Sequence, residues 1–266
     1  MLNIQDSHYI TELCKGAELM SRYGWSERNA GNISVLLPEA EFETPREILR
    51  KFQLPFSPPE LLGRVILVTG TGKYFRNIAQ NPAENLGVLR VGKGELELLW
   101  GHENGGAPTS EISSHLRSHA ARLRADPLHS VVCHTHPTAL IAMSAVHDLS
   151  EREFSRTLWS SAGECLMFLP EGLGVLPWLP CGCDEIGLAT AEKMKNYRLV
   201  IWANHGIFAA GKSLDDALGL IEIAEKAADI YLKIANFPDK RLITAAQLRQ
   251  LAETCKITVK EGWLND

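Results

Sequence analysis

The residues best suited to chemistry in this chain are two histidines separated by a single residue, His134 and His136. They follow an apolar run at 130–133 and precede Pro137. Alternate residues of a β-strand point to the same face, so both imidazoles can reach one metal ion. Taken alone, the pair is explained equally well as a partly buried end of a strand. With His205, which follows a second apolar run, it has the pattern of a catalytic zinc site with an open position.

Two glutamates are candidates for proton transfer. Glu111 follows Pro108-Thr109-Ser110 at the expected start of a helix. By pattern alone, such an acid is best explained as a helix-start residue that the macrodipole stabilises. Its functional interpretation is a general base beside the metal. Glu164 precedes an apolar run that is expected to be a strand. It can be interpreted as a solvated carboxylate at the end of that strand or as a second acidic group of the site.

Three turns of small residues could bind an anion. They cover residues 30–34, 69–73 and 108–110, and they are rich in glycine, threonine, serine and asparagine. Such turns expose backbone N–H groups that can hold a phosphate, although each signal is weak by itself. The turn at 69–73 is not a Walker A loop, since Leu67 stands at the first glycine position and Tyr74 at that of Ser or Thr.

The remaining histidines and cysteines give weaker signals. His115 and His119 have the i, i+4 spacing of helical metal ligands but lack the glutamate of the zincin pattern, which favours a structural role. Cys181-Gly182-Cys183 is expected to be an incidental pair in a loop rather than a metal or redox site. The other histidines lie in polar or loop contexts and are expected to be solvated, namely His8, His102, His129 and His147.

Composition limits the class of protein. The chain has 266 residues, of which 45% are hydrophobic and 22% charged, as in an ordinary soluble globular protein. A net charge of −5 argues against nucleic-acid binding, and the apolar runs are too short to span a membrane. The first residues lack the features of a signal peptide. The scattered cysteines favour a reducing, cytoplasmic location.

The elements that must position these residues alternate along the chain. Strands and helices interleave, while several neighbouring strands have hairpin spacing. This pattern predicts one domain with an α/β fold, a three-layer sandwich whose central mixed, largely antiparallel β-sheet is flanked by helices. An excursion at 38–62 belongs to this domain. The expected strands are 33–37, 65–69, 87–91, 96–100, 130–134, 165–169, 198–203 and 207–210, and the expected helices are 8–23, from about 109, after 137, 184–194, 213–235 and 244–254.

Five of these motifs together resemble the class II aldolase/adducin family. Their order and approximate spacing match the family at 30–34, 69–73, 108–111, 134–137 and 204–206. The resemblance covers nearly the whole chain and implies that residues 1–266 form a single class II aldolase domain. It is closest to sugar-phosphate aldolases that also carry the excursion at 38–62. Thr71 replaces a serine of those proteins, which preserves the hydroxyl.

The resemblance implies an activity and residue roles. The implied reaction is reversible cleavage of L-rhamnulose 1-phosphate to dihydroxyacetone phosphate and L-lactaldehyde, in rhamnose catabolism. One zinc ion per subunit would be bound by His134, His136 and His205. Glu111 would be the catalytic acid/base. Glu164 would act near the aldehyde from a neighbouring subunit of a homotetramer. The residues that would bind the phosphate are Asn29, Asn32, Thr71, Thr109 and Ser110.

The chemistry of these residue types agrees with that activity. Aldol cleavage leaves an enediolate, which needs a Lewis acid and a proton carrier. A Schiff-base route needs a desolvated lysine, and no lysine lies in an apolar run. Two alternatives stay open: a related sugar-phosphate aldolase, epimerase or dehydratase with the same zinc site, and a non-catalytic, adducin-like module.

Overall fold

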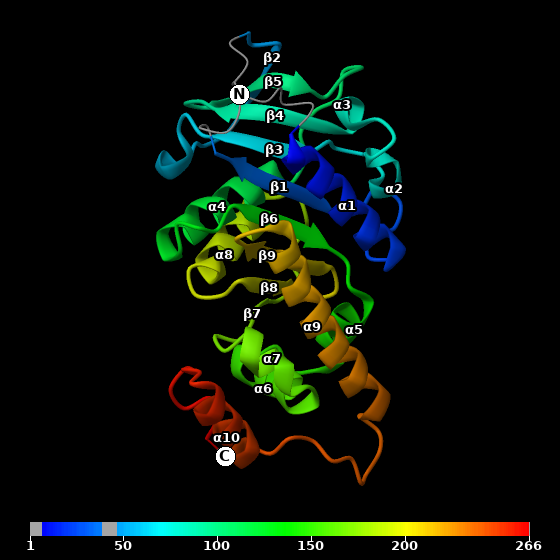
Figure 1. Ribbon diagram of the computed structural model, residues 1–266, viewed down its shortest axis with the longest axis vertical. Coiled ribbons are helices and arrows are strands. Elements are labelled where there is room, and N and C mark those ends of the chain that lie inside the picture. Colours follow the sequence, from blue (N-terminus) through cyan, green and yellow to red (C-terminus); the bar gives the residue numbers. More distant parts are fainter. Residues whose placement is uncertain (1–6, 39–46, 266) are drawn as a thin grey trace.

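A nine-stranded sheet organises the part of the chain that the computed structural model describes, residues 7–38 and 47–265. The strands lie in the order β2-β5-β4-β3-β1-β6-β9-β8-β7, from the top to the bottom of Figure 1. Within the described residues only β7 and β8 pair in parallel. The strands are β1 (Asn32–Leu37), β2 (Arg50–Gln53), β3 (Val65–Thr69), β4 (Leu86–Val91), β5 (Glu95–Gly101), β6 (Val131–Thr135), β7 (Gly174–Leu176), β8 (Leu199–Trp202) and β9 (Gly206–Gly211).

Helices cover both faces of this sheet, which confirms the predicted three-layer α/β sandwich. Figure 1 shows α1 and α9 in front of the sheet, and these pack with α5, α6, α7 and α10 around one large core. Helices α4 and α8 pack on the opposite face. The helices are α1 (His8–Arg22), α2 (Phe75–Ile78), α3 (Pro82–Asn85), α4 (Ile112–Ala125), α5 (Thr138–Val146), α6 (Glu151–Ser161), α7 (Gly163–Phe168), α8 (Asp184–Met194), α9 (Leu214–Ile234) and α10 (Ala245–Cys255), with a 3-10 turn at Pro59–Leu61.

The three central strands bring distant parts of the chain into register. Asn32 of β1 lies opposite His134 of β6, and His134 lies opposite Phe208 of β9. All residues of β1, β6 and β9 are buried because helices cover both faces here. Alternation along β1 therefore sends Ile33 to the core under α9 and Ser34 to α4. This register places the ends of β1 and β6 together.

The expected strand at 165–169 is wrong, because residues 165–168 belong to α7 (Gly163–Phe168) and Leu169 is its C-cap. Cys165, Leu166 and Leu169 are buried, whereas Met167 and Phe168 are about half exposed. That spacing is helical, and a short apolar run does not by itself distinguish a strand from a buried helix. The edge of the sheet beside β8 is formed by β7 instead.

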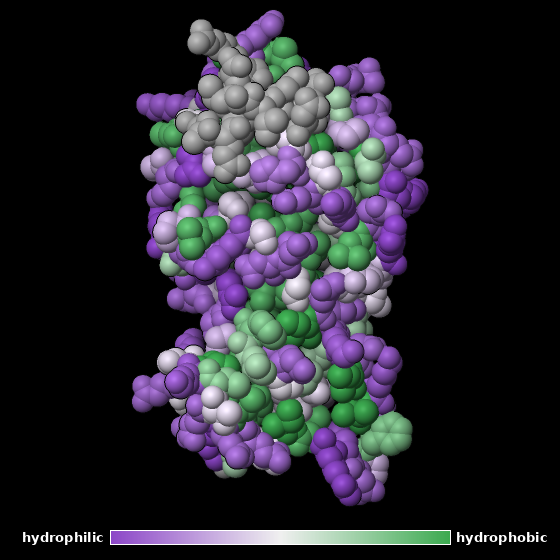
Figure 2. Space-filling model, viewed as in Figure 1, coloured by the Kyte–Doolittle hydropathy of each residue, from purple (hydrophilic) through white to green (hydrophobic). Residues whose placement is uncertain are grey.

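The predicted excursion at 38–62 contributes to the sheet in its described part. It holds β2, which pairs with β5 at the sheet edge, and the turn Pro59–Leu61. Residues 39–46 of the excursion lie outside the described residues. Among the described residues, none of the helices combines the length and the apolar composition of a membrane-spanning segment. Figure 2 shows hydrophobic residues gathered on the lower part of one face, where α5, α7 and the end of α9 lie.

Candidate functional site

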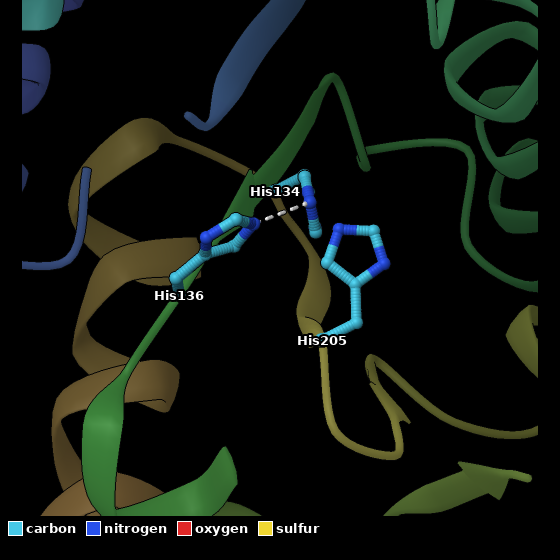
Figure 3. Close-up of side chains that lie close together, drawn as sticks. All are labelled: His134, His136 and His205. Atoms are coloured by element: carbon cyan, nitrogen blue, oxygen red, sulfur yellow. Dashed lines mark hydrogen bonds between the residues drawn. The ribbon is translucent and has the colours of Figure 1, made fainter. Parts of the chain in front are cut away.

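The predicted metal ligands meet where β6 ends. His134 belongs to β6, His136 follows that strand, and His205 lies in the turn between β8 and β9. Figure 3 shows the three imidazoles facing one another, and one ring nitrogen of each lies within 4.8 Å of the others. Among the described residues, no other group of three or more histidine, cysteine or acidic side chains lies close enough together to hold one metal ion. Three converging imidazoles match the donor set of a transition-metal site.

The outer nitrogens of two of these rings have partners. His134 Nδ1 donates to the carbonyl oxygen of Ile207 at 3.0 Å, and His136 Nδ1 donates to Glu27 Oε1 at 2.6 Å. These bonds leave both Nε2 atoms unprotonated in the neutral rings, and those atoms face each other at 3.3 Å. Two lone pairs so close together repel each other unless a proton or a metal ion lies between them, so the geometry is compatible with a bound metal ion.

Burial favours the neutral form of two of the three histidines, His134 and His205. Burial, helped by the neighbouring His136 and His205, lowers the pKa of His134 well below its usual value, although the bond to Ile207 opposes this. Burial likewise lowers the pKa of His205. Burial alone would raise the pKa of Glu27, but the hydrogen bond from His136, a backbone hydrogen bond and the charges of His136 and His205 together lower it, and the net shift is downward. Neutral imidazoles with an ionised outer partner are the form that binds metal.

A glycine makes the close approach of the three rings possible. A Cβ atom at Gly206 would lie 2.6 Å from the carbonyl oxygen of Thr135, 2.8 Å from His136 Cδ2 and 3.0 Å from His134 Cε1. Such distances are too short for any side chain. Gly206 therefore lets the β8–β9 turn pass directly against the end of β6, which brings His205 to the other two histidines.

Glu111 lies beside the histidines and does not act as a helix cap. It occupies the N-cap position of α4, but its side chain makes no capping hydrogen bond. Instead Oε2 accepts a hydrogen bond from Asn32 Nδ2 at 2.7 Å and lies 3.7 Å from His134 Nε2. Only 9% of the residue is exposed. The carboxylate is thus aimed at the metal cluster rather than at the helix backbone.

The predicted anion-binding turns surround the same cavity, which has a volume of about 150 Å³. Gly31 and Gly72 adopt left-handed conformations with φ of 84° and 70°, which shape two of the turns. A bridge between Gly70 and Pro108 ties the second turn to the third. The lining consists of Asn29, Ala30, Gly31, Asn32, Gly70, Thr71, Gly72, Thr109, Ser110, Glu111, His134, His136 and His205.

One predicted site residue lies elsewhere. Glu164 is exposed in the first turn of α7 and does not line this cavity, so it lies apart from the other predicted site residues. The cysteines Cys181 and Cys183 lie in the loop before α8, where the Cys183 thiol contacts the Pro180 carbonyl oxygen at 3.0 Å. The structure thus places both cysteines in a loop, as predicted.

Several polar residues, at the site or in the interior, were missed or misjudged from the sequence. Glu27 carries no motif of its own, and its role depends on a contact across the fold. His115 and His119 are fully buried around Ser34, in agreement with a structural role. His102 is also buried rather than solvated, as is His129, because loop residues can fold into the interior.

Comparison with known proteins agrees with this geometry. The sequence pattern of the class II aldolase and adducin N-terminal domain matches residues 11–232. A rhamnulose-1-phosphate aldolase of Listeria monocytogenes is 47% identical, with 99% of each chain covered. One of Enterococcus faecalis is 46% identical, covering 100% of this chain and 97% of that protein. The crystal structure of a sugar-phosphate aldolase from Thermotoga maritima superposes with a TM-score of 0.77 and 32% identity, covering 88% of this chain and 97% of that one.

Proposed function

The chain belongs to the class II aldolase and adducin family and is a class II aldolase, a lyase; from this premise we propose that it cleaves L-rhamnulose 1-phosphate reversibly. The products would be dihydroxyacetone phosphate and L-lactaldehyde, in rhamnose catabolism. The names and full-length coverage of the relatives from Listeria and Enterococcus support this substrate. One class II aldolase domain would span residues 1–266.

Zinc is the proposed cofactor, one ion per subunit, held by His134, His136 and His205. Three neutral nitrogen donors that converge within 4.8 Å suit zinc and leave an open position. When bound, the ion would stabilise the negative charge that develops on the substrate oxygens as the carbon–carbon bond breaks. Glu27 would hold the His136 ring in orientation through its 2.6 Å hydrogen bond.

Glu111 is the proposed acid/base. In cleavage it would give a proton to the carbon that becomes part of dihydroxyacetone phosphate, and in condensation it would remove that proton. The carboxylate is buried beside His134 and oriented by Asn32, so it can face a substrate in the cavity. A positioned carboxylate of this kind typically contributes about 10²–10⁴-fold to the rate.

The small-residue turns are the proposed phosphate site. Amide and hydroxyl groups of the residues around the cavity would bind the phosphate and so fix the far end of the substrate. The proposed donors are Asn29, Asn32, Thr71, Thr109 and Ser110. The exposed Glu164 would act near the aldehyde of a neighbouring subunit, in a homotetramer. A cytoplasmic location agrees with the scattered cysteines.

The observation that carries this proposal is the convergence of the metal cluster, Glu111 and the polar turns on one small cavity. The test offers the purified protein L-rhamnulose 1-phosphate or L-fuculose 1-phosphate, with and without a chelator, and follows dihydroxyacetone phosphate release. We expect faster release from the rhamnulose ester and its loss with chelator, restored by zinc.

Other outcomes would assign the chain differently. Preference for the fuculose ester would indicate a related aldolase. Conversion of a sugar phosphate without triose phosphate release would indicate an epimerase or dehydratase. A protein without bound metal and without turnover would indicate an adducin-like module.

A further inference from the structure

A series of buried hydrogen bonds connects His119 in α4 to Glu111. Asn32 and Ser34 lie two residues apart on β1, so both face α4. On that helix His115 and His119 lie one turn apart and face β1. The four residues are at most 6% exposed, so water does not compete for their hydrogen bonds.

The contacts form a continuous path. His119 Nε2 lies 2.8 Å from Ser34 Oγ, which lies 2.6 Å from His115 Nδ1. His115 Nε2 contacts Asn32 Oδ1 in a short hydrogen bond. Asn32 Nδ2 then donates to Glu111 Oε2 at 2.7 Å. Each step of this path is thus a hydrogen bond between two side chains.

The donor and acceptor of each bond can be assigned by starting from the Asn32 amide, which donates to Glu111. Asn32 donates to the carboxylate with its amide nitrogen, so its oxygen faces His115 and must accept from Nε2–H. A neutral imidazole has one N–H, which leaves Nδ1 to accept from the Ser34 hydroxyl. The Ser34 oxygen then accepts from His119 Nε2–H. Burial holds the pKa of His115 at about 3 and lowers that of His119, so both rings stay neutral.

We propose that His115, held by Ser34 and His119, is a positioning residue that fixes the amide of Asn32 and through it the carboxylate of Glu111. If the amide turned over, its oxygen would face the carboxylate and the two would repel each other. The N–H of His115 prevents that reversal, because it needs an acceptor. This inference rests on the proposed acid/base role of Glu111.

Ser118 provides a matched control for Ser34 in this path. Ser118 lies on the same helix and is also fully buried, but its hydroxyl has no hydrogen-bond partner within the described residues. Ser34→Ala and Ser118→Ala therefore delete the same group from similar surroundings. Only the first interrupts the path. His115→Leu removes both ring nitrogens, whereas His115→Gln retains an N–H near the position of Nε2.

The experiment measures kcat, KM and bound zinc for these variants in the cleavage of L-rhamnulose 1-phosphate. We expect Ser34→Ala and His115→Leu to lower kcat by about 10- to 100-fold, the effect of a misplaced reacting group, with zinc content unchanged and a smaller change in KM. His115→Gln should recover most of the loss, and Ser118→Ala should match the unmodified protein. Equal kcat for the two serine variants would overturn the proposal.

A second measurement needs no activity. Nitrogen NMR of the ¹⁵N-histidine-labelled protein, with the His115 signals assigned by their loss in His115→Gln, should show a proton on Nε2 and none on Nδ1. A proton on Nδ1 would overturn the positioning role even if the protein is an aldolase. Absence of turnover in the unmodified protein would instead refute the proposed function, while the NMR result still tests the path.

Discussion

Replacing Glu111 with glutamine tests the proposed chemistry most directly. Glutamine has nearly the same shape as glutamate, and its oxygen can still accept the hydrogen bond from Asn32, which is 2.7 Å in the present structure. The three histidines are untouched, so the protein should fold and retain its metal. The change removes one property, the ability of this side chain to take up and release a proton.

The magnitude follows from comparing two effects. Weakening the buried hydrogen bond from Asn32 would cost about 0.5–1.5 kcal/mol of stability, too little to unfold an ordinary domain. Loss of a positioned acid/base lowers the rate by about 10²–10⁴-fold. At about 1.36 kcal/mol for each tenfold, that raises the activation free energy by about 3–5 kcal/mol. The kinetic effect should therefore exceed the structural one.

Two assays separate this loss from a general defect. Release of dihydroxyacetone phosphate reports the whole reaction, and exchange of deuterium from solvent into dihydroxyacetone phosphate alone reports the proton transfer. Glu111→Gln should lower both by a similar factor. Glu103→Gln, at an exposed acid in the preceding loop, is the control and should leave both unchanged. Exchange by Glu111→Gln at the rate of the unmodified protein would refute the assignment.

Other substitutions test the site and its surroundings. His205→Ala should lose bound zinc, because two histidines hold the ion weakly; full occupancy by metal analysis would show that another group is the third ligand. Glu27→Ala should weaken zinc binding by about 10- to 100-fold in a competition titration, since it frees the His136 ring, and unchanged affinity would exclude that role. Gly206→Ala should abolish both zinc binding and turnover, because its Cβ would lie 2.6 Å from a backbone oxygen; an active, zinc-loaded variant would contradict the close approach. Burial and two nearby cations lower the pKa of His102 from 6.5 to about 4, so the unfolded chain binds more protons and stability falls as the pH falls from 6.5 toward 4. His102→Asn should flatten this dependence in urea denaturation of the metal-free protein by up to about 1.4 kcal/mol per pH unit, and an unchanged slope would contradict it. Asparagine suits this position because it tolerates the left-handed backbone of His102, whose φ is 44°.

Local pattern predicted most elements because their side chains follow simple periods. The helix expected at 184–194 is observed as Asp184–Met194, and the paired strands β4 and β5 occur where strands were expected at 87–91 and 96–100. The apolar run at 165–169 was assigned wrongly, because its burial depends on which neighbours it packs against. Helix α7 contacts α6, α9 and α10, and the sequence of the run does not reveal those contacts.

The sequence by itself determined the chemical groups of the site: two histidines at strand spacing, a third after another apolar run, and turns of small polar residues. Tertiary structure decided how they meet. The pairing of β6 with β1 and β9 brings His134 beside Asn32 and the turn that holds His205. The same packing turns Glu111 from a helix cap into a buried carboxylate. Such contacts join residues more than 70 positions apart, and they depend on sheet register and helix packing rather than on local pattern.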